Sequence, residues 1–158
     1  MKSIPFRYTA YLSLGSNIIP REHYLEQALL ELKRLSQINI LKVSRVLETK
    51  ALENENQPDF LNQVVKIYIS DSFTLPNFLE TLQSIERKLG RINRTWKGPR
   101  EIDIDILSYE GVEMTTDHLT LPHHSLYTRP FIRKLLEEME ENSVCEYYWS
   151  NLHEKYHR

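Results

Sequence analysis

The sequence lacks cysteine pairs, long apolar runs and a strong excess of either charge. Its one cysteine, Cys145, excludes an internal disulfide and is compatible with a reducing compartment. No apolar run approaches the length of a transmembrane helix, and the first 15 residues lack the apolar stretch of a signal peptide. These absences predict a cytoplasmic protein that does not contact a membrane.

The charge balance argues against a general nucleic-acid binder, because such domains are usually basic and this chain has a net charge of −2. The charges are unevenly placed. Arg87–Arg100 holds six cationic residues and no acidic one, whereas Glu137–Glu146 holds five acidic residues and no cationic one. With 41% hydrophobic and 27% charged residues, the chain suits a single compact domain over residues 1–158, and we expect a monomer.

Hydrophobic periodicity predicts four strands and three helices, with no function assigned to the segment from about residue 140 onward. The expected elements are a strand over Tyr8–Leu14, a helix from Pro20, strands over Ile38–Val46 and Phe60–Ile69 separated by a loop over Glu48–Asp59, a helix from Thr74 to Gly90, a basic loop over Arg91–Pro99, a strand over Glu101–Leu107, and a helix near Arg129–Glu140. The order β-α-β-β-α-β is the ferredoxin-like α+β arrangement, with an antiparallel sheet and helices on one face.

The last predicted strand has two chemically different faces. Because side chains alternate along a strand, Ile102, Ile104 and Ile106 share one face, and Asp103 and Asp105 share the other. Helices must cover the apolar face. Two carboxylates about 7 Å apart along a strand repel each other, and a divalent cation such as Mg²⁺ relieves that repulsion.

Two alternatives remain for these aspartates: a solvated strand face, or an ion pair with the nearby Arg100. The preceding strand presents Phe60 and Asn62 on one face, opposite its apolar positions, so a ring and an amide accompany the carboxylates. Gly15-Ser16-Asn17 lacks the pattern of a phosphate-binding loop and is interpreted as a structural turn.

A run of cations spaced every third residue precedes the aspartates. A solvated helix face is one interpretation, but Gly90 and Gly98-Pro99 argue against a continuous helix. A cationic loop leading into a pair of carboxylates suits polyphosphate chemistry, because guanidinium groups and Mg²⁺ neutralise phosphate oxygens. The four cations are Arg91, Arg94, Lys97 and Arg100.

A third cluster follows at Pro122-His123-His124. A zinc site is disfavoured, because the chain has one cysteine and no second histidine at helical ligand spacing. We interpret His123 as a hydrogen-bond donor to phosphate. Phe131 is equally consistent with a core position and a functional one.

Together these motifs resemble 6-hydroxymethyl-7,8-dihydropterin pyrophosphokinase, a family of folate synthesis. The stretch Gly98-Pro99-Arg100-Glu101-Ile102-Asp103-Ile104-Asp105 is the most specific part of the resemblance. The other matching stretches are Ala10-Tyr11-Leu12-Ser13-Leu14-Gly15-Ser16-Asn17, Gln57-Pro58-Asp59-Phe60-Leu61-Asn62, Leu89-Gly90-Arg91, and Leu119-Thr120-Leu121-Pro122-His123 with Arg129 and Phe131.

The resemblance implies transfer of a pyrophosphoryl group from Mg·ATP to the hydroxymethyl group of a reduced pterin, with release of AMP. For the pterin it implies a sandwich between Phe60 and Phe131, a hydrogen bond from Asn62, and backbone contacts at Thr49 and Leu52. The prolines that often follow Thr49 in the family are replaced here by other residues.

The resemblance also implies the groups that handle ATP and metal. Asp103 and Asp105 correspond to the carboxylates that hold two Mg²⁺ ions, and Arg91 and Arg100 to the catalytic arginines, with Asp105 as a possible aid to deprotonation. The expected ATP contacts are Gln83, Glu86, Arg94, Lys97, Arg100, Ile106, Thr120, His123 and Arg129. The family often has an aromatic residue just before Gly-Pro-Arg, whereas here Lys97 occupies that place and Trp96 precedes it.

Two other functions fit a ferredoxin-like sheet: RNA binding, and a regulatory role without catalysis. RNA binding predicts a basic, aromatic-rich sheet, whereas this sheet carries Asp103 and Asp105. A regulatory domain has no use for two such carboxylates beside four cations. We therefore expect small-molecule substrates, ATP and the hydroxymethyl pterin, and no nucleic-acid partner.

Overall fold

The computed structural model describes residues 6–51, 56–92 and 98–145. Its main element is a five-stranded sheet, with a pair of short strands beside it. The elements in chain order are β1 (Phe6–Ser16), α1 (Arg21–Lys33), β2 (Ile38–Val43), β3 (Leu47–Thr49), β4 (Phe60–Ser70), α2 (Leu75–Lys88), β5 (Asp103–Tyr109), β6 (Met114–Thr115), β7 (Thr120–Leu121), α3 (Ser125–Thr128) and α4 (Pro130–Glu138).

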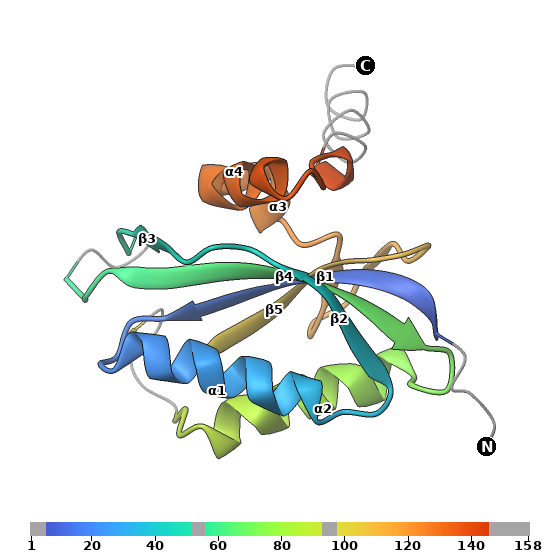
Figure 1. Ribbon diagram of the computed structural model, residues 1–158, viewed down its shortest axis with the longest axis horizontal. Helices are drawn as coiled ribbons and strands as arrows, with labels where there is room; N and C mark the ends of the chain where they lie inside the picture. The colour runs from blue at the N-terminus through green and yellow to red at the C-terminus, as the bar shows by residue number, and fades with distance from the viewer. Residues whose placement is uncertain (1–5, 52–55, 93–97, 146–158) are drawn as a thin grey trace.

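The sheet has the predicted topology. Its order is β2-β4-β1-β5, every pairing is antiparallel, and the edge strand β3 pairs with β4. The ferredoxin-like α+β fold is confirmed. The two long strands β1 and β4 lie in the middle of the sheet and therefore supply most of both its faces (Figure 1).

One face of the sheet is apolar and closed by α1 and α2 (Figure 1). Alternate residues of β1, such as Leu12 and Leu14, have no exposed surface, as expected from strand alternation. Helix α2 begins where the Thr74 hydroxyl accepts a hydrogen bond from the Asn77 N–H at 3.3 Å. It ends before Gly90, whose φ of 103° favours glycine.

The opposite face is partly covered by α3 and α4, which corrects the prediction of helices on one face only (Figure 1). Val64 and Leu107, on the same strand faces as Asn62 and Asp103, pack under Leu135 and neighbouring residues of α4. Alternation alone did not predict this cover, because the polar positions nearby suggested an open face.

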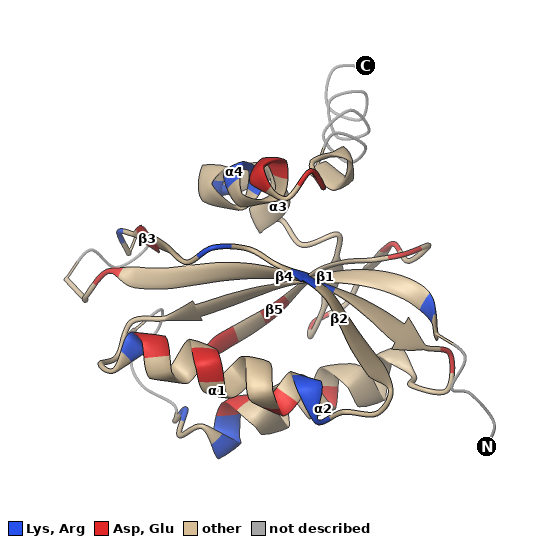
Figure 2. Cartoon of the chain, in the orientation of Figure 1, with Lys and Arg blue, Asp and Glu red and all other residues tan. Residues whose placement is uncertain are grey.

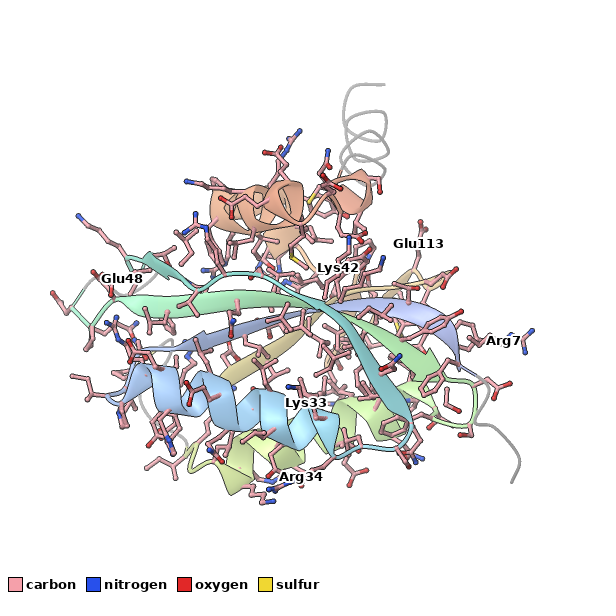
Figure 3. All side chains as sticks on the ribbon, viewed as in Figure 1. Arg7, Lys33, Arg34, Lys42, Glu48 and Glu113 are labelled. Atoms are coloured by element: carbon pink, nitrogen blue, oxygen red, sulfur yellow. The ribbon has the colours of Figure 1, made fainter. Side chains whose placement is uncertain are left out.

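Four side chains fasten the chain beyond α4 to the sheet. The Glu141 carboxylate accepts hydrogen bonds from the Tyr11 hydroxyl and the Lys66 ammonium, both at 2.7 Å. Lys42, labelled in Figure 3, lies 3.0 Å from the same carboxylate. Burial tends to raise the pKa of Glu141, but the hydrogen bonds from Lys66, Tyr11 and Lys42 outweigh it and lower the pKa to about 2.

Several element boundaries differ from the predicted ones. The second strand ends at Val43, and β5 begins at Asp103 and extends to Tyr109. The expected loop over Glu48–Asp59 contains the end of β3, in which Leu47–Thr49 pairs with Phe60–Asn62. Polar residues at a sheet edge look like a loop in sequence, although their backbone can still pair.

Candidate active site

The uncovered part of the second face forms a cavity of about 300 Å³. Three residues lie in one cross-strand row at its floor: Asn62 on β4 pairs with Gly15 on β1, which pairs with Asp103 on β5. Gly15 contributes no side chain, so the row is hollow between the amide and the carboxylate. The predicted site residues that line this cavity are Thr49, Phe60, Asn62, Arg91, Arg100, Asp103, Asp105, His123, Arg129 and Phe131.

A second cavity, of about 670 Å³, adjoins the first on the side of α2. Arg91, Asp103, Asp105, His123 and His124 line both cavities. The acidic positions on β5, visible in Figure 2, therefore stand where the two cavities meet. The predicted ATP contacts that line the second cavity are Gln83, Glu86, Ile106, Thr120 and His123.

The structure thus brings together every predicted site residue that it describes. Three predicted residues, Leu52, Arg94 and Lys97, lie outside the described residues. Arg129 lines the first cavity and does not line the second.

Asp103 is ion-paired to both predicted catalytic arginines. Its carboxylate lies 2.9 Å from Nη1 of Arg91 and 3.3 Å from Nη1 of Arg100. The ion pair with Arg100 that the sequence left open as an alternative is therefore present. Because Arg91 contacts Oδ1 and Arg100 contacts Oδ2 of the same carboxylate, the two arginines also hold positive charge beside the junction of the cavities.

Glu86 is the buried centre of this cluster. Its carboxylate accepts hydrogen bonds from Nη1 of Arg91 at 2.6 Å and from the backbone N–H of Ile104 at 2.8 Å. Burial and the nearby charge of Asp103 raise the pKa of Glu86 to about 7, against the opposing effect of Arg91. Glu86 thus ties α2 to β5 and orients Arg91, in addition to lining the second cavity.

The pKa of Asp105 is raised well above its usual range. Burial is the main cause, followed by the charges of Asp103 and Glu86, while Arg100 and Arg91 oppose the shift. When all three carboxylates are ionised, they outnumber the two arginines by one charge. The donor set therefore fits a divalent cation, which would relieve the repulsion between carboxylates.

The protein supplies only part of a metal shell. Within the described residues, no group of three or more histidine, cysteine, aspartate or glutamate side chains is arranged to hold a metal ion. Two carboxylates at the edge of a roomy cavity are instead the pattern in which Mg²⁺ keeps its remaining positions for water and substrate phosphate.

The β4 side of the first cavity is built around Asn62. Its Nδ2 donates to the Leu47 carbonyl at 3.0 Å and to the Thr49 hydroxyl at 2.8 Å. The short strand β3 therefore orients the amide, and the Oδ1 end remains to accept from a ligand. Phe60 lies under the guanidinium of Arg100, whose Cζ is 5.6 Å from the ring centroid, so the aromatic and cationic groups meet.

The proton position on His123 follows from its contacts. Nδ1 accepts from the backbone N–H of Ser125 at 3.1 Å and lies 2.6 Å from the Ser125 hydroxyl. Since a backbone N–H can only donate, the neutral ring carries its proton on Nε2. His123 therefore presents a donor, as the prediction of a phosphate contact requires. Sequence analysis missed Ser125, because its role depends on a turn that no periodicity reveals.

A family profile for 7,8-dihydro-6-hydroxymethylpterin-pyrophosphokinase (HPPK) matches residues 11–141. The chain belongs to this family. A relative named 2-amino-4-hydroxy-6-hydroxymethyldihydropteridine pyrophosphokinase, from Bacillus subtilis, is 40% identical over 131 residues, which cover 82% of this chain and 77% of that one.

Some relatives are longer than this chain. The folic acid synthesis protein fol1 of Schizosaccharomyces pombe is 39% identical over 138 residues, 87% of this chain but only 19% of fol1. A crystal structure of an HPPK-DHPS in complex with substrates shares the fold, with a TM-score of 0.59 at 16% identity, covering 96% of this chain and 45% of that one.

Among the described residues, no helix is long and apolar enough to cross a membrane.

Proposed function

We propose that this chain transfers a pyrophosphoryl group from ATP to 6-hydroxymethyl-7,8-dihydropterin, giving AMP and the pterin-methyl diphosphate. The observation that carries the proposal is the position of Asp103 and Asp105 where two cavities meet. One cavity has the aromatic and amide lining of a pterin site, and the other has the predicted ATP contacts. Family membership favours this enzyme over the RNA-binding and regulatory alternatives.

In the proposed reaction, the hydroxymethyl oxygen attacks the β-phosphorus of ATP. The bond between that phosphorus and the oxygen bridging to the α-phosphate breaks, and AMP leaves with the oxygen. Such transfers depend on alignment and charge neutralisation more than on covalent help from the protein. Asp105 borders both cavities, and its ionised carboxylate is placed to accept the hydroxyl proton.

Asp103 and Asp105 would hold two Mg²⁺ ions together with phosphate oxygens. When bound, Mg²⁺ neutralises phosphate charge and makes the attacking hydroxyl more acidic. Arg91 and Arg100, now paired with Asp103, would turn toward the phosphates, where they stabilise the charge that develops during transfer. Nε2 of His123 would donate to a phosphate oxygen.

The pterin would lie in the first cavity between Phe60 and Phe131, both of which line it. Because Nδ2 of Asn62 is engaged by Leu47 and Thr49, Oδ1 is the atom that would accept from a pterin N–H. We propose that the chain does this as a monomer, with no partner beyond its two substrates.

The test is incubation of the protein with Mg·ATP and 6-hydroxymethyl-7,8-dihydropterin, with AMP measured by chromatography. Formation of AMP that requires the pterin and stops with EDTA is expected. AMP formation without pterin, or none with it, would contradict the proposal.

A further inference from the structure

The feature that neither the motifs nor the proposed reaction explains is Asn17, at the end of β1. The sequence suggested a structural turn, but the Asn17 residue is only 1% exposed and its side chain joins two loops. Its Nδ2 donates to Oε1 of Gln57 at 2.8 Å and to the Pro58 carbonyl at 3.1 Å. Its Oδ1 accepts from the backbone N–H of Arg100 at 2.8 Å.

The orientation of this amide is fixed by its partners. The Pro58 carbonyl can only accept and the Arg100 N–H can only donate, so Nδ2 and Oδ1 of Asn17 cannot exchange places. The backbone N–H of Asn17 also donates to the Arg100 carbonyl at 3.2 Å. Asn17 therefore holds the Arg100 backbone at two points and the opposite loop at two more.

The two loops joined by Asn17 carry different halves of the site. Gln57 and Pro58 lead directly into Phe60, the proposed pterin ring partner. Arg100 carries the guanidinium that reaches Asp103. A neighbouring residue strengthens the first attachment, because Nη1 of Arg21 donates to the Asp59 carbonyl at 2.9 Å.

We propose that Asn17 is a positioning residue that fixes the distance between Arg100 and the loop before Phe60 (residues 56–59, the Phe60 loop). The pterin hydroxyl and the transferred phosphorus are thereby held in line. This inference rests on the proposed function. Small errors in alignment are costly in group transfer, because rate depends on reacting atoms being held at near-attack distance. A bridge between the two substrate-holding loops controls that distance without touching either substrate.

Asparagine suits this bridge because it carries a donor and an acceptor on one short, planar group. Aspartate has the same shape and keeps the acceptor for Arg100, but it places an oxygen against the Pro58 carbonyl. Leucine has a similar volume and neither function. The two substitutions therefore separate the Phe60 side of the bridge from the Arg100 side.

The experiment compares Asn17→Asp and Asn17→Leu with a matched control, Gln63→Leu. Gln63 is also a buried amide, and its Nε2 donates to the Ser44 carbonyl at 3.0 Å, but it contacts neither loop. Thermal unfolding first gives the Tm of each protein. We then measure, well below that Tm, kcat, the KM for each substrate, and the calorimetric Kd for the pterin and for a non-hydrolysable ATP analogue.

We expect Asn17→Asp to raise the pterin KM and Kd about tenfold, with the Kd of the ATP analogue changed less than about threefold. Asn17→Leu should in addition lower kcat about 100-fold. Gln63→Leu should lower the Tm by a comparable amount and leave kcat and the KM for each substrate unchanged. Asn17 variants that lose stability as Gln63→Leu does, but keep kcat and pterin affinity, would overturn the proposal.

Should neither Asn17 variant fold, two variants at Gln57, a half-buried residue that also lines the first cavity, replace them: Gln57→Met removes the acceptor of Asn17 Nδ2, and Gln57→Glu keeps it. A pterin KM raised in Gln57→Met but not in Gln57→Glu, with unchanged ATP affinity, supports the bridge, and equal pterin KM values in the two variants contradict it. Wild-type protein that binds both ligands but forms no AMP would contradict the proposed function, whereas the calorimetric comparison of variants would still decide the role of Asn17.

Discussion

The two faces of the sheet are made by the same strands and serve different purposes. On the α1 and α2 side, alternate residues such as Leu12 and Ile104 are buried in a continuous apolar core. On the other side, α4 covers one part, and the rest is a polar cavity with Asp103 and Asp105 at its floor. Alternation thus lets a small sheet combine a stabilising apolar layer with a charged one whose carboxylates repel each other.

The two faces should respond oppositely to mutation. Residues of the closed face contribute apolar burial, and their removal should reduce stability without changing the chemistry of the folded protein. Residues of the cavity floor are held together against their own charge repulsion, and their removal should reduce activity with little or no loss of stability.

The largest expected effect is on turnover in Arg91→Ala and Arg100→Ala. A guanidinium that stabilises developing phosphate charge contributes roughly 10³–10⁵-fold in rate, so kcat should fall far more than the ATP KM rises. The measurement is steady-state kinetics with both substrates varied. Arg45→Ala is the control, because Arg45 pairs with Glu138 on the surface away from the cavities. A raised KM with unchanged kcat would reassign both arginines to nucleotide binding.

On the closed face, Phe78→Ala should lower the free energy of unfolding by about 3–5 kcal/mol, because the Phe78 residue has no exposed surface. Urea unfolding measures this change. The kcat of the folded fraction should stay within about twofold of wild type, since Phe78 packs among the apolar residues away from the cavities. A matching loss of kcat would show that the two faces are coupled.

Within the cavity, Phe60→Ala and Asn62→Ala should weaken pterin binding far more than ATP binding. Stacking contributes about 0.5–1.5 kcal/mol beyond area burial, and the amide hydrogen bond contributes about as much. Calorimetric titration of each ligand separates the two affinities. Equal losses for both ligands would mean that these residues support the fold alone.

The smallest expected effect concerns Glu141, which joins α4 to the sheet. Its pKa is lowered from 4.5 to about 2, so its ionised form stabilises the fold fully above pH 4.5. That contribution is lost as pH falls from 4.5 toward 2, since the folded protein must then bind a proton it resists. Glu141→Gln should cost about 1 kcal/mol at pH 7 and progressively less at pH 4 and pH 3.

Urea unfolding of both proteins at each pH tests this prediction. Glu113→Gln, an exposed position labelled in Figure 3, is the control and should show no such trend. A cost for Glu141→Gln that stays constant from pH 7 to pH 3 would contradict the lowered pKa.

Local patterns were sufficient to predict the order of the main elements and the division of β5 into an apolar and an acidic face. Each of these properties repeats every two or four residues and is therefore visible in a short window. The resemblance supplied the remaining site residues, and every one of them within the described residues lines one of the two cavities.

What the sequence did not reveal depends on contacts between distant segments. Strand β3 exists because Leu47–Thr49 pairs with β4, although its own composition is that of a loop. The chain just after α4 is held to the sheet by Glu141, whose hydrogen-bond donor Tyr11 lies 130 positions away. Asn17 looked like part of a turn for the same reason, since its partners lie 40 and 83 positions along the chain.

The most direct test of the central claim is a crystal structure with Mn²⁺, a non-hydrolysable ATP analogue and the pterin, with the metal located by its anomalous scattering. The account predicts that the anomalous peaks mark Mn²⁺ ions coordinated by the carboxylates of both Asp103 and Asp105. It also predicts that Arg91 and Arg100 have turned from Asp103 to the phosphates. Metal bound elsewhere, with both arginines still paired to Asp103, would contradict it.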